Sequence, residues 1–111
     1  MSELEAVKKL RESLDAKFAQ DIVILDLHEV SPIADYFVIA TGGNAPQLAS
    51  LQDTAEEVLK GCGLKLSHIE GQRSAKWILL DFGSVVVHLF DKESRGYYNL
   101  ERIWGDARHI N

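Results

Sequence analysis

The residues best suited to support chemistry are Gly42, Gly43 and Asn44, which separate an apolar run from a stretch with helical spacing. Backbone N–H groups at such a junction can bind a phosphate group, although this loop lacks the further glycine and lysine of the common nucleotide-binding motifs. Asp91 and Glu93 have a D-x-E spacing suited to holding metal ions, but they follow about fifty residues later in a polar segment that we expect to be irregular. A nucleotide-dependent transferase is therefore one hypothesis, and a helix cap with solvated carboxylates is the alternative.

The remaining reactive residue types show no catalytic or metal-binding pattern. His28, His68, His88 and His109 lack metal-ligand spacing, and the single cysteine, Cys62, has no second sulfur in the chain. His88 follows a run of valines without a nearby nucleophile, which favours a core or interface histidine over a catalytic base. Lysine and arginine are scattered among acidic residues, without an aromatic RNA-recognition motif. We expect no enzyme activity, no metal, no cofactor and no sequence-specific binding of nucleic acid.

The stretch from Lys76 to Phe90 is the element around which the others are arranged. Two apolar runs meet at Gly83 and Ser84, and a two-residue loop that begins with glycine predicts a β-hairpin with a type II′ turn. The alternation of side chains makes both faces of this hairpin largely apolar. A hairpin that is apolar on both faces belongs in the interior of a sheet.

Around this hairpin, the spacing of apolar residues predicts three helices and three further strands. Ser2 and Glu5 form a capping box, and an apolar stripe that ends at Phe18 predicts a helix over residues 3–18. The other predicted elements are strands over 21–27, 36–41 and 64–69, a helix from Asn44 to Gly61, and a short helix with Tyr97, Leu100, Ile103 and Trp104. The order α-β-β-α-β-β-β-α predicts an α/β fold with a mixed five-stranded sheet, in a single domain over residues 1–111.

Three helices are too few to cover both faces of such a sheet. Five strands about 4.8 Å apart span roughly 24 Å, whereas one helix covers about 10 Å. We therefore expect part of the apolar sheet to remain open for a partner or for a second copy of the chain. The net charge of −5 favours a positively charged partner.

The sequence also predicts a soluble, cytoplasmic protein. No apolar run approaches the roughly 20 residues of a membrane span, and the N-terminal stretch is charged and amphipathic, unlike a signal peptide. A lone cysteine fits a reducing compartment.

Six segments carry a resemblance to a known family. They are Asp21-Ile-Val-Ile-Leu-Asp, Asp35-Tyr-Phe-Val-Ile-Ala-Thr-Gly, Glu70-Gly71, Trp77-Ile-Leu-Leu-Asp-Phe-Gly, Val86-Val-His-Leu-Phe and Arg95-Gly-Tyr-Tyr-Asn-Leu-Glu-Arg-Ile-Trp. This set, which runs over residues 21–104, resembles the ribosomal silencing factor family, also called Iojap-like proteins. The resemblance implies a fold related to nucleotidyltransferases without the catalytic set, and frequent homodimers. It also implies binding to ribosomal protein fourteen of the large subunit, which blocks joining of the small subunit and represses translation, notably when nutrients are scarce.

Trp77 is the residue that we expect to anchor this ribosomal contact. It begins a strand beside a polar loop, and a tryptophan in that position is often partly exposed. Glu70 and Asp81 are placed to meet basic groups of the partner, and His88 on the next strand is placed to make a polar contact. The next candidates are Tyr98 and Trp104. Besides the transferase, a purely structural homodimer is the remaining alternative.

Overall fold

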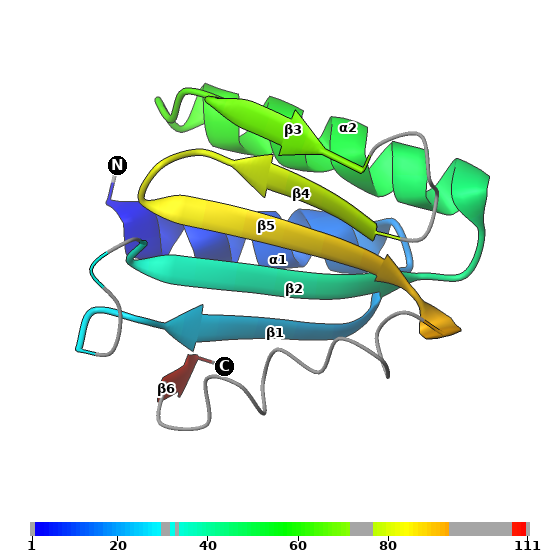
Figure 1. The fold of residues 1–111 in the computed structure, drawn as a ribbon, viewed down its shortest axis with the longest axis horizontal. Helices are drawn as coiled ribbons and strands as arrows, with labels where there is room; N and C mark the ends of the chain where they lie inside the picture. Colours follow the sequence, from blue (N-terminus) through cyan, green and yellow to red (C-terminus); the bar gives the residue numbers. More distant parts are fainter. Residues whose placement is uncertain (1, 30–31, 33, 72–76, 94–107, 111) are drawn as a thin grey trace.

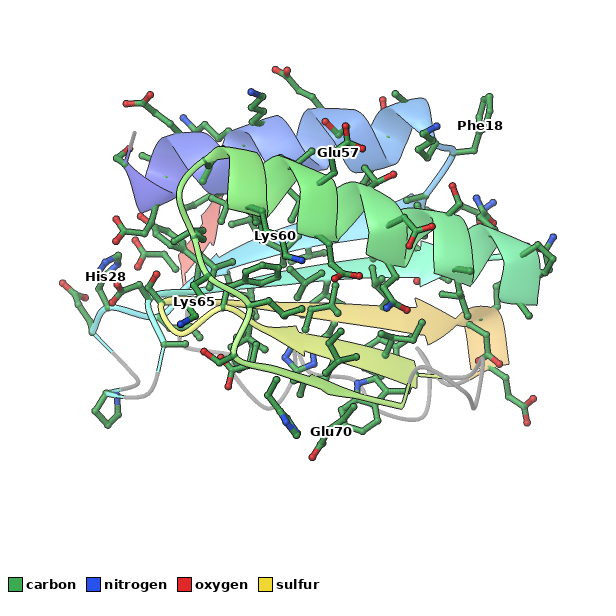
Figure 2. All side chains as sticks on the ribbon, turned by 90° about the horizontal axis from the view of Figure 1, so that it is seen from above. Phe18, His28, Glu57, Lys60, Lys65 and Glu70 are labelled. Carbon is green, nitrogen blue, oxygen red and sulfur yellow. The ribbon has the colours of Figure 1, made fainter. Side chains whose placement is uncertain are left out.

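The computed structural model describes residues 2–29, 32, 34–71, 77–93 and 108–110. These residues form α1 (Glu3–Ala16), β1 (Gln20–Asp26), β2 (Tyr36–Gly42), α2 (Ala45–Gly61), β3 (His68–Glu70), β4 (Trp77–Asp81), β5 (Val85–Asp91) and β6 (Arg108–Ile110). The strands form one sheet in the order β3-β4-β5-β2-β1-β6. The pair β2 and β5 is parallel, and the other neighbouring strands are antiparallel. Figures 1 and 2 show α1 and α2 side by side on one face of this sheet.

The predicted hairpin is confirmed as β4 and β5. Gly83 has a φ of +80°, which suits a turn of the primed type, and the Phe82 N–H donates to the Val85 carbonyl at 2.9 Å. The Asp81 carboxylate also accepts a hydrogen bond from the Gly83 N–H at 2.7 Å. Because β5 pairs with β2 as well as β4, the hairpin lies in the interior of the sheet, as its two apolar faces require.

Both helices begin where the sequence predicts, because each has a side-chain cap. The Ser2 hydroxyl accepts a hydrogen bond from the Glu5 N–H at 3.2 Å, and the Asn44 side chain accepts one from the Gln47 N–H at 2.8 Å. Their apolar stripes pack on the sheet and form the larger core. Among its fully buried side chains are Leu10, Leu14, Val38, Leu48, Leu51, Leu59, Leu80, Val87 and Leu89.

The described residues differ from the prediction in the number of elements. They contain two helices and not three, and the third predicted helix, over Tyr97 to Trp104, lies outside the described residues. The five predicted strands are present, and β6 is a sixth, which pairs with β1. The strand predicted over 64–69 is shorter and shifted, since β3 covers His68–Glu70.

The end of α1 is also different from the prediction. The helix ends at Ala16, and Phe18 does not continue the buried stripe but is 81% exposed. Phe18 has a φ of +66°, its N–H donates to the Asp15 carbonyl at 2.9 Å, and the Ala19 N–H donates to the Leu14 carbonyl at 3.1 Å. These two bonds form a Schellman motif, whose left-handed position normally holds glycine.

Candidate partner-binding face of the sheet

The sheet has one face that points away from α1 and α2, and we call it the far face. Strand register assigns its residues, because paired residues on neighbouring strands project to the same side. They are His68 and Glu70 from β3, Trp77, Leu79 and Asp81 from β4, Val86, His88 and Phe90 from β5, Phe37, Ile39 and Thr41 from β2, and Val23 and Leu25 from β1. A second apolar cluster lies on this face, separate from the core beneath the helices.

Four of the six residues predicted to contact a partner lie together on the far face. Glu70 is opposite Leu79, and Leu79 is opposite His88, so that these three form one row across β3, β4 and β5. Trp77 and Asp81 lie on either side of Leu79 along β4. Glu70 is exposed, Trp77 and Asp81 are half-buried, and His88 is buried. The other two candidates, Tyr98 and Trp104, lie outside the described residues.

Trp77 is partly exposed, as its position at the start of a strand predicts. Its ring stacks on Phe90, with 6.4 Å between the ring centroids and 21° between the planes. Phe37 and Leu79, which the sequence analysis did not single out, are likewise only partly buried on this face. Period-two alternation was the signal that could have found both, since it places them beside the chosen residues. The far face thus presents aromatic and apolar surface.

Gly71 allows the backbone after β3 to lie close to the start of β4. It has a φ of +78°, and a Cβ atom added there would lie 2.1 Å from the Trp77 carbonyl oxygen. A side chain therefore has neither the backbone conformation nor the space that it needs. This gives a physical reason for a glycine directly after Glu70 in the sequence.

Carboxylates border the apolar surface at the β3 edge. The Glu70 carboxylate lies 2.9 Å from the His68 ring nitrogen, and both side chains are more than half exposed. Asp81 accepts the hydrogen bond from the hairpin turn, so that part of its role is structural. The border is suited to a partner with basic groups.

His88 is the unusual residue of the far face. It is 6% exposed, and neither ring nitrogen has a hydrogen-bond partner among the described residues. The ring packs edge-on against Phe37, with centroids 4.6 Å apart, and lies parallel to Phe90 at 6.3 Å. Burial lowers the pKa of His88 to about 4, so the imidazole is neutral at pH 7. An unpaired buried polar group of this kind costs about 1–3 kcal/mol.

The loop at Gly42 and Gly43 makes contacts that compete with phosphate binding. The Gly43 N–H already donates to the Gln47 side-chain oxygen, and the Leu48 N–H to the Asn44 carbonyl. A Cβ atom at Gly42 would lie 2.9 Å from Leu48 Cδ2, so this glycine allows α2 to pack closely on β2. The helix-cap interpretation therefore describes the loop better than the phosphate interpretation.

The prediction for the two transferase carboxylates is wrong in one respect. Asp91 is not in an irregular segment, because it is the last residue of β5 and pairs with Gly42 across the parallel strands. Glu93 follows two residues later. Among the described residues, no group of three histidine, cysteine, aspartate or glutamate side chains is arranged to hold a metal ion.

A histidine with two carboxylates was not anticipated from the sequence. His28 Nδ1 lies 2.6 Å from the Asp26 carboxylate, and its Nε2 lies 3.5 Å from that of Asp35. The hydrogen bond to Asp26 is the main reason that the pKa of His28 is raised. The ring is half exposed and lies edge-on to Tyr36, so the group is a surface ion pair at one end of β1 and β2.

Neither of the two described helices is both long enough and apolar enough to cross a membrane.

Comparison with known proteins gives one consistent result. A family model described as ribosomal silencing factor during starvation matches residues 1–111. The ribosomal silencing factor of Halalkalibacterium halodurans is 38% identical over 107 residues, which cover 96% of this chain and 92% of that protein. A Mus musculus protein named mitochondrial assembly of ribosomal large subunit protein 1 is 32% identical over 89 residues, 78% of this chain and 39% of that protein. A crystal structure of a Chromobacterium violaceum protein has a TM-score of 0.88 and 32% identity, and covers 95% of this chain and 88% of that chain.

Proposed function

This chain belongs to the ribosomal silencing factor family, and from that premise we propose that it binds the large ribosomal subunit through ribosomal protein fourteen. Bound there, it blocks association with the small subunit and so represses translation in the cytoplasm. The name of the mouse relative, which refers to the large ribosomal subunit, supports this choice of subunit. The action is steric and needs no nucleotide, cofactor or catalytic residue.

The observation that carries this proposal is the composition of the far face. Trp77 is half-buried over Phe90, and the exposed Glu70 lies at the β3 edge of the same face. A partly exposed aromatic ring with acidic neighbours suits a basic protein surface, because the ring supplies buried area and the carboxylates supply charge complementarity. The overall charge of −5 acts in the same direction and disfavours direct binding to ribosomal RNA.

We assign the contact to Trp77 as the anchor, with Glu70 and Asp81 as charged contacts. We assign His88 as the polar contact beneath them, since neither ring nitrogen has a partner in the part of the chain that the structure describes. Tyr98 and Trp104 remain candidates on the basis of the family resemblance alone. We also propose that the free protein is a homodimer.

Sucrose-gradient sedimentation tests this proposal. The protein should travel with free large subunits and lower the yield of joined ribosomes in buffer without nucleotide. Trp77→Ala should remove this co-sedimentation, whereas Phe18→Ala, a matched loss of an aromatic ring at the end of α1, should not. Equal binding to joined ribosomes, or a strict requirement for nucleotide, would contradict the occlusion mechanism. Of these two results, only the requirement for nucleotide would favour the transferase hypothesis.

A further inference from the structure

The imidazole of His28 lies between two carboxylates from different parts of the chain. Its Nδ1 is 2.6 Å from the carboxylate of Asp26, the last residue of β1, and its Nε2 is 3.5 Å from that of Asp35, which comes just before β2. The His28 backbone N–H donates to the same Asp26 oxygen at 3.0 Å. Figure 2 shows His28 at the end of the molecule at which α1 begins. One ring thus connects the end of β1 with the start of β2.

The backbone at this place is joined to the turn of the central hairpin. The Leu27 N–H donates to the Asp35 carbonyl at 2.8 Å. The Asp35 N–H donates to the Ser84 carbonyl at 2.8 Å, and the Tyr36 N–H donates to the same carbonyl at 3.0 Å. These three amide groups therefore report on the junction of β1, β2 and the hairpin turn, next to the His28 ring.

The ionisable groups around the ring come from several elements and are mainly acidic. Asp26 and Asp35 lie on either side of it, and the charge of Glu3, in the first turn of α1, acts on it as well. Tyr36 lies edge-on to the ring, with 5.0 Å between the centroids, and burial and these carboxylates raise the pKa of its phenol. On β6, Arg108 is opposite Asp26 in the strand register.

This environment favours the protonated form of the ring. The hydrogen bond to Asp26 is the main reason that the pKa of His28 is raised above 6.5, and the three negative charges add to it, against a lowering by partial desolvation. The folded chain therefore holds this proton more tightly than the unfolded chain does. The resulting stabilisation is complete below pH 6.5 and is lost as the pH rises through the raised pKa.

We propose that His28 is a proton-dependent clamp, which fastens the end of β1 to the start of β2 when its ring is protonated. The charged ring has one N–H for each carboxylate, whereas the neutral ring has only one N–H. Loss of the proton therefore removes the attraction to one carboxylate and the positive charge that lies between two negative ones. The junction should then open locally more often, without unfolding of the sheet.

NMR of the whole protein between pH 6 and 8.5 tests the clamp. The His28 ring should titrate above pH 6.5. Hydrogen-exchange protection of the Leu27, Asp35 and Tyr36 amides, corrected for the intrinsic rate, should fall by about two- to fivefold over this range, as expected of one exposed ion pair. Amides in the middle of β2 should keep their protection. A ring that titrates at or below pH 6.5, or protection that does not change with pH, would overturn the proposal.

Substitutions identify the group that titrates. His28→Ala should give the three amides the same protection at both pH values, equal to that of the wild type at pH 8.5. Asp26→Asn removes a charge but keeps an oxygen that can accept the backbone N–H, and it should lower the pKa of His28. Glu70→Gln is the matched control, since Glu70 lies 2.9 Å from the His68 ring in a similarly exposed pair at the β3 edge. It should leave both the His28 titration and the protection unchanged. If His28→Ala keeps the pH dependence of the wild type, another group is responsible and the clamp is wrong.

Discussion

The buried imidazole of His88 should make the stability of the protein depend on pH between about 4 and 6.5. Burial lowers its pKa from 6.5 to about 4 in the folded protein. Within this range the unfolded chain binds a proton that the folded chain does not, so stability falls as the pH falls through 6.5. The loss is complete once the pH lies below the folded pKa.

The size of this effect follows from the two pKa values. Relative to pH 8, the free energy of unfolding should decrease by about 2 kcal/mol at pH 5 and by about 3 kcal/mol below pH 4 from this residue alone. His28 acts in the opposite direction, because its pKa is raised in the folded protein, but it is an exposed residue. The contribution of His88 therefore has to be isolated by comparison with a variant.

Urea unfolding of the wild type and of His88→Leu at pH 8, 6 and 5 provides that comparison. Leucine cannot titrate and leaves no unpaired nitrogen, so the variant should be at least as stable as the wild type at pH 8. The difference in unfolding free energy should then grow by about 2 kcal/mol toward pH 5, since the other titrating groups are common to both proteins. Equal losses in the two proteins would refute the assignment of a neutral, unpartnered His88.

Three further predictions concern single residues. Trp77→Ala should weaken binding to large subunits by about 30-fold to 1000-fold, which corresponds to the 2–4 kcal/mol of an aromatic anchor, and quantitative co-sedimentation measures this. A large drop in melting temperature for this variant would instead identify Trp77 as a core residue. Phe18→Gly should raise the free energy of urea unfolding by about 1 kcal/mol, because the left-handed backbone no longer carries a side chain. Gly71→Ala should lower the free energy of unfolding by about 3 kcal/mol, since the new Cβ would clash with the Trp77 carbonyl oxygen. If the variant is as stable in urea as the wild type, the backbone at this turn adapts to the side chain.

The sequence alone predicts the structure correctly where one periodicity and one turn determine it. Gly83 and Ser84 set the register of β4 and β5, and strict alternation then places Trp77, Asp81 and His88 on one face. Glu70 lies on the same face because the short strand β3 pairs with β4 and its side chains follow the same alternation. The residues that we propose as partner contacts on this face could thus be placed from local spacing and strand pairing alone.

The end of α1 could not be predicted from local spacing. Phe18 follows Leu14 by four residues, which continues a helical stripe, and no glycine marks the stop. The turn is instead held by Gln47, which is distant in the sequence. The extension of β5 to Asp91 depends in the same way on its pairing with Gly42. The pairing of β6 with β1 is also a long-range contact, made by three residues without an apolar run.

The parallel pairing of β2 with β5 constrains when the sheet of this protein can fold during its synthesis. The two strands at the middle of the sheet are separated by α2, β3 and β4, so the centre cannot form until β5 has been synthesised. A nascent chain that stops after α2 contains the residues of β1 and β2 but lacks the strands that carry Trp77 and His88. The chain therefore becomes able to act on a ribosome only late in its own translation, when its C-terminal half has emerged and paired.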